Sequence, residues 1–171
     1  MPQRIRLSRV KGWRIPDNTV NVARAGPHPG KLGNLFIVGR HGTRAECAAK
    51  FWQLAHGFIS VSEDIDPDAQ AQLHQRLHAM LPDLAGQDVA CWCALDGGAC
   101  HGDVILALAN PGLPLPKWMT DGVTLKRVRI GMHIDDYLVL KAKAEAKRSA
   151  ASTPTVTPDL IRGPASSEPS P

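Results

Sequence analysis

Residues 88–110, DVACWCALDGGACHGDVILALAN, decide the fold because they lead from a strand through a glycine-bearing loop into a helix. In residues 88–93 the side chains of Val89, Cys91 and Cys93 alternate with those of Ala90 and Trp92, which predicts a short strand. Gly97 and Gly98 then turn the chain. From residue 101 apolar side chains recur at helical spacing, and Pro111 ends the helix after residue 110. Open α/β sheets usually place their chemistry where strand ends meet helix starts, so we expect the functional site here.

A cluster of metal-ligating side chains lies in this stretch. Three of the four cysteines, Cys91, Cys93 and Cys100, occupy thirteen residues together with His101 and Asp103. Tetrahedral zinc sites use cysteine and histidine, but they prefer about two to four residues between paired cysteines, and a single residue separates Cys91 from Cys93. The adjacent Cys100 and His101 do not readily face one ion. Because alternate strand side chains share a face, the three cysteines remain a candidate metal site, with zinc as the candidate cofactor.

The same residues also fit an enzyme site. Cys100 and His101 would begin a helix, where free backbone amides favour an anion such as a thiolate or a phosphate. Asp103 would orient His101 or complement the helix dipole, so Cys100, His101 and Asp103 are the candidate catalytic residues. A third interpretation is structural: cysteines are among the most buried residues, and Cys91 and Cys93 would then be core positions. The pattern favours none of the three decisively, and whether the protein is an enzyme stays open.

A glycine-rich loop follows the first predicted strand, residues 19–24. Residues 26–34, GPHPGKLGN, contain three glycines and two prolines, which exclude regular structure. Such a loop brings backbone amides close to a phosphate. It is not a Walker motif, because the spacing differs and Leu32 stands where a Ser or Thr is required. We take Arg24, Gly33 and Asn34 as the candidate ligand-binding residues.

The charges are divided unevenly along the chain. Residues 1–50 carry ten Lys and Arg against two Asp and Glu, whereas residues 51–110 carry one against eight. Residues 111–171 carry nine against six. A basic first third would suit phosphates, and nucleic acid is therefore one candidate partner. Solvated charge, or pairing between the basic and acidic segments, explains the same distribution.

The pattern of elements predicts one small α/β domain, with a short mixed or parallel sheet of three to four strands flanked by helices. Its core spans residues 9–110. Helices are expected at residues 43–56, which a Thr43-Glu46 capping box begins, and at residues 66–80. Residues 111–148 form a C-terminal extension with a strand at 123–130 and a helix at 133–148. Residues 149–171 are rich in Ser, Thr, Ala and Pro, and we expect a disordered tail there.

The composition indicates a cytoplasmic protein with no membrane partner. The longest apolar runs are too short to cross a bilayer, and no apolar segment follows the basic N-terminus to form a secretory signal. Three cysteines within ten residues are typical of metal or thiol chemistry in a reducing compartment rather than of a secreted disulfide framework.

Several short motifs resemble a known family. They are GWR at residues 12–14, NTVNV at 18–22 with Arg24, GN at 33–34, ACWC at 90–93 and CHGDV at 100–104. Over residues 11–110 the chain resembles the bacterial and phage family catalogued as domain of unknown function 4326. That family usually has proline after the Gly-Asn pair, where this chain has Leu35. The resemblance implies no activity, because the family is defined without one.

Taken together, the residues favour an enzyme or binder that acts on a nucleotide or another phosphorylated small molecule. Arg24, Asn34, Cys100, His101 and Asp103 would gather where strand ends meet helix starts, with the Gly33-Asn34 loop holding the phosphate. Two alternatives remain: a nucleic-acid-binding module that uses the basic first third, and a small structural zinc-binding domain.

Overall fold

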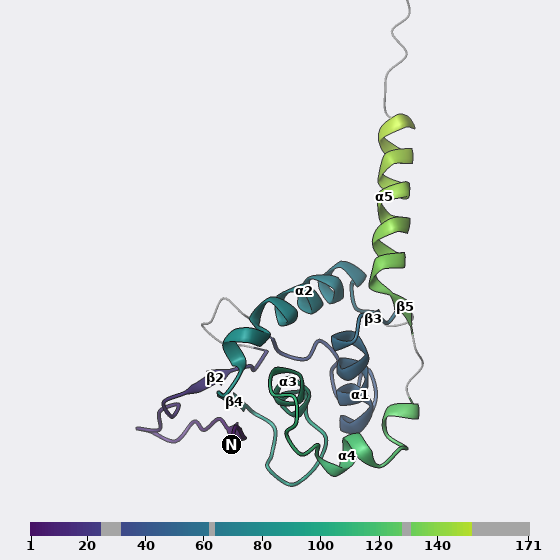
Figure 1. The fold of residues 1–171 in the computed structure, drawn as a ribbon. Helices are drawn as coiled ribbons and strands as arrows, with labels where there is room; N and C mark the ends of the chain where they lie inside the picture. The colour runs from purple at the N-terminus through teal and green to yellow at the C-terminus, as the bar shows by residue number, and fades with distance from the viewer. Residues whose placement is uncertain (25–31, 62–63, 128–130, 152–171) are drawn as a thin grey trace, which may run out of the picture. The chain divides into compact units, whose positions relative to one another are not determined.

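We analysed a computed structural model, which describes residues 1–24, 32–61, 64–127 and 131–151. The chain divides into two compact units, residues 1–137 and 138–171. The first unit is a small mixed α/β domain with a three-stranded parallel sheet flanked by helices, as the sequence predicts (Figure 1).

The sheet consists of β1 (Arg4–Arg6), β4 (Asp88–Cys91) and β2 (Thr19–Asn21), with β4 in the centre. Both outer strands run parallel to β4, and Val89 aligns with Arg4 on one side and with Val20 on the other. The carboxyl ends of parallel strands meet at one edge of a sheet, so Cys91 emerges between the ends of β1 and β2. The strand β1 was not predicted, and it precedes residue 9, where the sequence places the start of the core.

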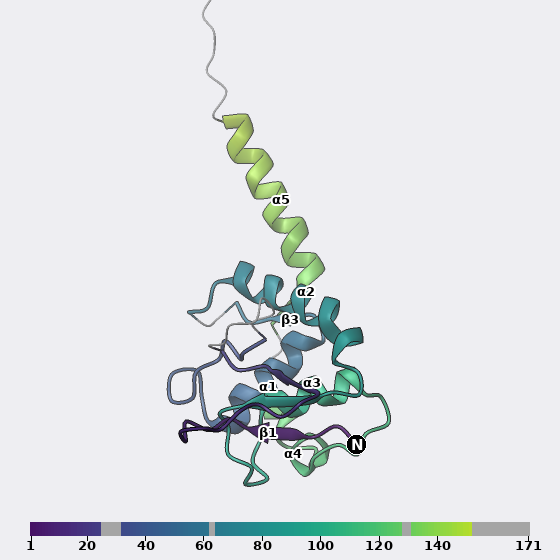
Figure 2. The same cartoon turned by 90° about the vertical axis from the view of Figure 1, so that its left-hand side faces the viewer.

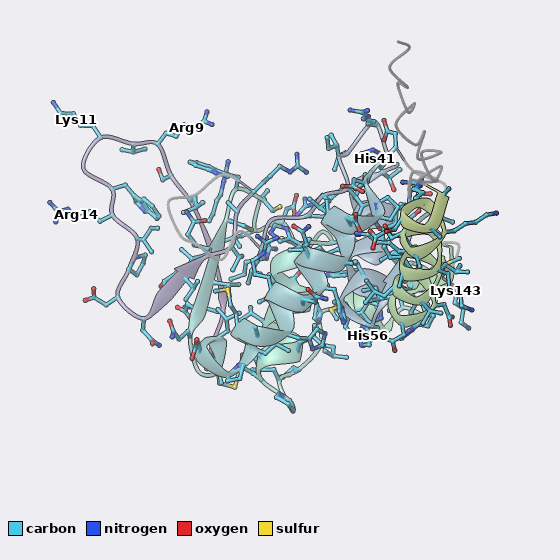
Figure 3. The ribbon with its side chains drawn as sticks, turned by 90° about the horizontal axis from the view of Figure 1, so that it is seen from above. Arg9, Lys11, Arg14, His41, His56 and Lys143 are labelled. Carbon is cyan, nitrogen blue, oxygen red and sulfur yellow. The ribbon has the colours of Figure 1, made fainter. Side chains whose placement is uncertain are left out.

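Alternation along β4 divides the core into two clusters. Val89 and Cys91 belong to the large cluster that the helices cover. Ala90 points to the opposite face and packs with Leu7 and Ala23, against which Trp13 and other partly buried side chains lie. The segment between β1 and β2 therefore covers the second face of the sheet (Figures 2 and 3).

Three helices build the large cluster: α1 (Arg44–Ala55), α2 (Pro67–Leu84) and α3 (His101–Ala109). The predicted capping box of α1 is present, because the Thr43 side chain accepts from the Glu46 amide and the Glu46 carboxylate accepts from the Thr43 amide. The helix α2 begins at the predicted Asp66 cap but runs four residues beyond the predicted end at residue 80, through Pro82.

The C-terminal part of the first unit differs from the prediction. Residues 123–130 were expected to form a strand, but the Asp121 carboxylate accepts from the amides of Val123 and Thr124, and a 3₁₀ helix, Leu125–Arg127, follows. These bonds hold a turn and remove the two amides from any strand pairing. Residues 128–130 lie outside the described residues. The remaining elements are α4 (Lys117–Thr120) and an antiparallel pair, β3 (Phe58–Ile59) with β5 (Met132–His133).

The helix α5 (Ile134–Ala151) begins in the first unit and supplies the described part of the second. Within the first unit its Tyr137 hydroxyl donates to the Asp68 carboxylate over 2.8 Å. The expected tail starts at residue 149; residues 149–151 form the last part of α5, and 152–171 lie outside the described residues. Among the described helices none combines the length and the apolar character that a membrane span requires.

Candidate functional site

The site lies at the carboxyl edge of the sheet, between β4 and α3. Cys91 is the last residue of β4, and Cys100 is the N-cap of α3, whose first residue is His101. Cys93 lies in the connecting loop. The helix start occurs where the sequence predicts it, but the strand ends two residues before the predicted end at residue 93, so Cys93 lies in the loop and not on the strand. The loop returns the chain so that residues nine apart face each other.

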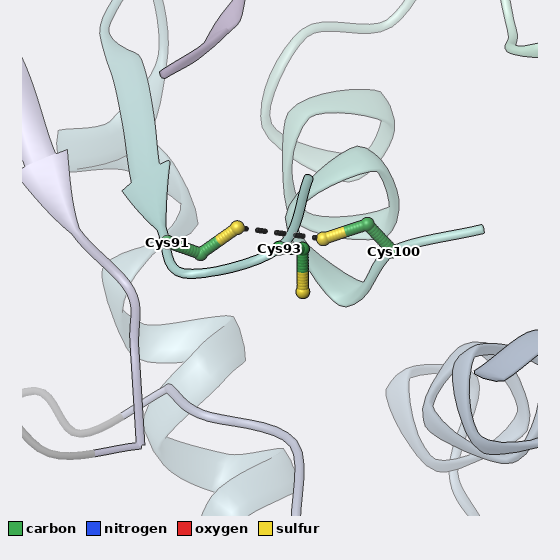
Figure 4. A group of neighbouring side chains, drawn as sticks. All are labelled: Cys91, Cys93 and Cys100. Atoms are coloured by element: carbon green, nitrogen blue, oxygen red, sulfur yellow. Dashed lines mark hydrogen bonds between the residues drawn. The ribbon is translucent and has the colours of Figure 1, made fainter. Parts of the chain in front are cut away.

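The three cysteines predicted as metal ligands do come together. Their sulfur atoms all lie within 4.8 Å of one another, and the Cys91 and Cys100 sulfurs are 3.5 Å apart (Figure 4). Cys91 and Cys100 are buried, whereas Cys93 is partly exposed. The Cys100 sulfur also accepts from the Gly102 amide over 3.3 Å, as a helix N-cap. Figure 4 shows the Cys91 and Cys100 sulfurs facing each other, with the Cys93 side chain next to them and its sulfur pointing to one side.

His101 adds a nitrogen to this cluster. The residue is 8% exposed, and its ring packs edge-on against Phe51. Nε2 lies 3.0 Å from the Val22 carbonyl oxygen, which can only accept, so Nε2 carries a proton and donates. Nδ1 lies 3.8 Å from the Cys100 sulfur. The group of side chains whose ligand atoms all lie within 4.8 Å of one another comprises the three cysteines and does not include His101.

Asp103, predicted to orient His101, has other partners. Arg4 Nε donates to one carboxylate oxygen over 2.9 Å, and Trp118 Nε1 donates to the other over 2.9 Å. Arg4 also donates to the Ala94 carbonyl over 3.1 Å. Asp103 thereby fixes an arginine of β1 beside the cluster. Both the Arg4 and the Asp103 side chains are largely buried, at 8% and 14% exposure, so the ion pair is little screened by solvent.

A second arginine holds the loop that joins Cys93 to Cys100. Arg44, the first residue of α1, donates from Nη1 to both carboxylate oxygens of Asp96 over 2.8 Å. Its Nε and Nη2 donate to three carbonyl oxygens of the same loop, those of Ala94, Gly98 and Ala99. A planar guanidinium suits this fork of acceptors in a way that lysine does not. Arg44 is thus positioned to fix the loop and, with it, the cysteines.

The surroundings favour negative charge on the cluster. Hydrogen bonds from Cys100 and Cys93 lower the pKa of the Cys91 thiol, and the reciprocal bonds raise the pKa of Cys93 and of Cys100. The three thiols thus share their first negative charge. Burial acts to lower the pKa of Arg4, but the charges of Cys100 and Asp103 raise it overall, so Arg4 stays cationic beside the thiols. A thiolate is the form that binds metal or reacts as a nucleophile.

A pocket of 380 Å³ opens beside the cluster. Arg24, Asn34, Cys100 and His101, four of the five residues expected to gather, line it; Asp103 does not. The remaining lining is mainly apolar, with Cys93, Arg44 and the following residues: Ala23, Phe36, Ile37, Val38, Cys47, Ala48, Trp92 and Ala99.

The predicted ligand-binding residues are bonded to one another. Arg24 Nε and Nη2 donate to the Asn34 carbonyl over 2.9 and 2.6 Å. The Asn34 side chain accepts from the Phe36 amide and donates to the Cys47 carbonyl. A Cβ on Gly33 would lie 2.1 Å from the Arg24 Cα, so only glycine permits this approach. The three residues therefore join the loop end to β2 and α1, and Arg24 uses two of its nitrogens for that purpose.

The sequence analysis missed Arg4, Arg44 and Val22. Each reaches the site from a distant part of the chain, and no local pattern marks Arg4 or Val22. Arg44 alone had a signal: it follows Thr43 at a predicted helix start, a position from which a side chain points toward neighbouring strand ends.

The comparisons with known proteins show the family of this chain. A family model described as "Domain of unknown function (DUF4326)" matches residues 5–111, which is more than half of the chain and includes the last two residues of β1 and the whole cysteine cluster. No curated protein and no solved structure matches the chain.

Proposed function

Because this chain belongs to the DUF4326 family, whose description assigns no activity, we propose a function from the site itself: Cys91, Cys93 and Cys100 bind a zinc ion. His101 Nδ1 is the fourth ligand. The observation that carries the proposal is the convergence of three thiols within 4.8 Å from a strand end, a loop and a helix start.

The distances suit tetrahedral coordination. With Zn–S bonds of about 2.3 Å, two sulfurs on one zinc ion lie about 3.8 Å apart, and a sulfur and a nitrogen lie about 3.5 Å apart. The Cys91 and Cys100 sulfurs are 3.5 Å apart, and Cys100 Sγ and His101 Nδ1 are 3.8 Å apart. Both pairs therefore lie close to the separations that a single zinc ion requires.

The second layer of the site also supports metal binding. A ligating histidine usually donates its other ring N–H to a carbonyl or carboxylate, which fixes the ring and its tautomer. Nε2 of His101 has such a partner in the Val22 carbonyl. Arg4 and Arg44 hold the loop from two sides and balance the thiolate charge.

A site with four protein ligands has no open position and serves mainly to hold structure. Here the zinc would join the end of β4 to the start of α3 and fix the wall of the adjoining pocket. The proposal requires a reducing compartment such as the cytoplasm, in which the thiols stay available.

The test is a zinc titration of the full-length chain, stripped of metal with chelator under reducing conditions. We expect one equivalent bound tightly, with a large rise in the thermal midpoint. Cys91→Ser, Cys93→Ser and Cys100→Ser should each weaken zinc binding strongly. Cys47→Ser is the matched control: Cys47 is buried but lies outside the cluster, so zinc binding should be unchanged. Absence of tight binding, or an equal effect of Cys47→Ser, would overturn the proposal.

A second candidate function is the binding of a nucleotide or another phosphorylated small molecule in the pocket. The observation in its favour is that Arg24, Asn34, Cys100 and His101 line one cavity of 380 Å³, a size that suits a small ligand. In this proposal Cys100 and His101 would meet the reacting group, and the Gly33-Asn34 turn with Arg24 would hold the phosphate. Titration with a nucleoside monophosphate, with the unphosphorylated nucleoside as control, tests it. Saturable binding of the nucleotide alone supports it, and failure of both to bind contradicts it.

A further inference from the structure

The last residue of β1 and the segment that leads to β2 carry cations that the site does not use. Arg6, Arg9, Lys11 and Arg14 are all exposed, and among the described residues none of the four is in a recorded ion pair. Figure 3 shows Arg9, Lys11 and Arg14 pointing outward from this segment. We call these four residues the basic arm. In contrast, Arg4 and Arg44 donate to carboxylates and carbonyls within the domain.

An exposed aromatic ring lies beside the basic arm. Trp92 follows β4 and is 45% exposed, which is unusual for a side chain that would bury a large apolar area. The Arg9 guanidinium lies over its ring, 4.8 Å from the centroid. Because the planar guanidinium of Arg9 lies over the Trp92 ring, the ring face is accessible to other planar groups. A nucleobase is such a group.

The Trp92 side chain lines both a surface groove and the pocket beside the cysteine cluster. A surface groove of 540 Å³ is lined by Arg6, Leu7, Ser8, Arg9 and Trp92. The same Trp92 lines the 380 Å³ pocket that contains Cys93, Cys100 and His101. A chain lying in the groove therefore passes over Trp92 to the mouth of the pocket.

From this arrangement we infer that the groove of the basic arm and Trp92 binds single-stranded nucleic acid. One base stacks on Trp92 in the place of the Arg9 guanidinium, which moves to the adjacent phosphate. Arg6, Lys11 and Arg14 contact further phosphates. Stacking on an exposed ring requires an unpaired base, so the site selects single strands over duplexes and over other polyanions. The inference is independent of metal binding.

The experiment is a fluorescence anisotropy titration of the full-length chain with a labelled oligothymidylate of about twelve nucleotides, a length that covers one such site. We expect saturable binding, with a logarithm of affinity that falls linearly with the logarithm of salt concentration. Trp92→Ala should weaken binding about 5- to 150-fold, whereas Trp92→Phe, which keeps a stacking ring, should stay near the wild type.

Two lysine variants form the matched pair for the charge. Lys11→Ala should reduce the slope of log affinity against log salt by about 0.7, the share of one phosphate contact on a single strand. Lys117→Ala removes the same charge from an exposed position on α4 and should leave the slope unchanged. Thermal midpoints confirm that each variant is folded, and Trp92→Phe keeps the test valid if Trp92→Ala fails to fold.

Any of four results would overturn the inference. They are absence of saturable binding, equal affinity for the matching duplex, equal effects of Lys11→Ala and Lys117→Ala, and a Trp92→Phe variant that binds as weakly as Trp92→Ala. Binding to vesicles with an anionic lipid headgroup, without binding to the oligonucleotide, would likewise replace nucleic acid with a membrane surface as the partner.

Discussion

Nε2 of His101 donates to the carbonyl oxygen of Val22 over 3.0 Å, although 79 residues separate the two in the chain. The bond joins the start of α3 to the residue that follows β2, and it turns Nδ1 toward Cys100. Burial acts to lower the pKa of His101, but hydrogen bonding with Cys93 and the charge of Cys91 raise it. This bond therefore determines that Nδ1, and not Nε2, faces any ligand bound at the cysteine cluster.

The His101 tautomer gives a first prediction. The bond to Val22 should keep a proton on Nε2, so nitrogen NMR of the imidazole in the zinc-loaded protein should show a protonated Nε2 and a metal-bound Nδ1 without a proton. Nδ1 should then shift on addition of zinc, while Nε2 stays protonated. A ring protonated on Nδ1 in the zinc-loaded protein would contradict the proposed ligand set.

Arg44 gives the second prediction. Arg44→Ala removes a side chain that donates to three carbonyls and a carboxylate, so it should cost about 2 kcal/mol of unfolding free energy and weaken zinc binding about 10- to 100-fold. Arg44→Lys keeps the charge but not the planar fork, and should recover only part of the loss. Denaturant unfolding and zinc titration measure the two effects.

The control for Arg44 is Arg40→Ala. Arg40 pairs with Asp64 in an exposed ion pair, so its loss should cost less than about 1 kcal/mol and should leave zinc binding unchanged. If both variants behave alike, the loop does not depend on Arg44 for its conformation.

The Asp96 carboxylate gives the third prediction. Its hydrogen bonds with Arg44 and with the Gly98 amide lower its pKa from an ordinary value of 3.8 to about 2. A depressed folded pKa contributes stability above the unfolded value, and this contribution is lost as the pH falls from about 4 toward about 2. The metal-free wild type should therefore have a higher thermal midpoint than Asp96→Asn at pH 7. The difference should narrow between pH 4 and pH 2; a difference that persists unchanged at pH 2 would exclude the carboxylate charge as its cause.

The α1 cap gives the fourth prediction. The Thr43 hydroxyl accepts from the Glu46 amide over 3.3 Å, so Thr43→Ala should cost about 1 kcal/mol in denaturant unfolding. Thr43→Ser keeps the hydroxyl and should restore most of that stability. Equal losses in both variants would show that the methyl group, and not the cap, matters.

The parts of the fold that depend on neighbouring residues were predicted from the sequence. The helices α1 and α2 were found because their caps lie within a few residues of the amides that they satisfy, and α3 was found from the helical spacing of its apolar side chains. The strand β1 was missed because Arg-Ile-Arg has no pattern of its own, and it exists through pairing with β4, with Arg4 opposite Val89. Over residues 123–127 the predicted strand is wrong for the opposite reason: the Asp121 carboxylate holds a local turn, and a 3₁₀ helix follows it.

In the candidate site, too, the features set by residues close in sequence were predicted and those set by distant contacts were not. The three cysteines were identified because they are close in sequence, and the structure brings their sulfurs together. The residues that position the cysteines were not identified, because their partners are distant in the sequence. Arg4 is 99 residues from Asp103, and Arg44 is 52 residues from Asp96. The role expected for Asp103 rested on its distance along the helix from His101, but the Arg4 and Trp118 donors occupy both of its oxygens.

X-ray absorption of the zinc-loaded protein at the zinc edge tests the central claim most directly, because it counts and identifies the atoms bound to the metal. The account predicts a four-coordinate ion with three sulfur ligands at about 2.3 Å and one nitrogen at about 2.0 Å. Cys47→Ser should leave this spectrum unchanged, and Cys93→Ser should remove one sulfur. A first shell of nitrogen and oxygen alone, or a sulfur count that falls with Cys47→Ser, would contradict it.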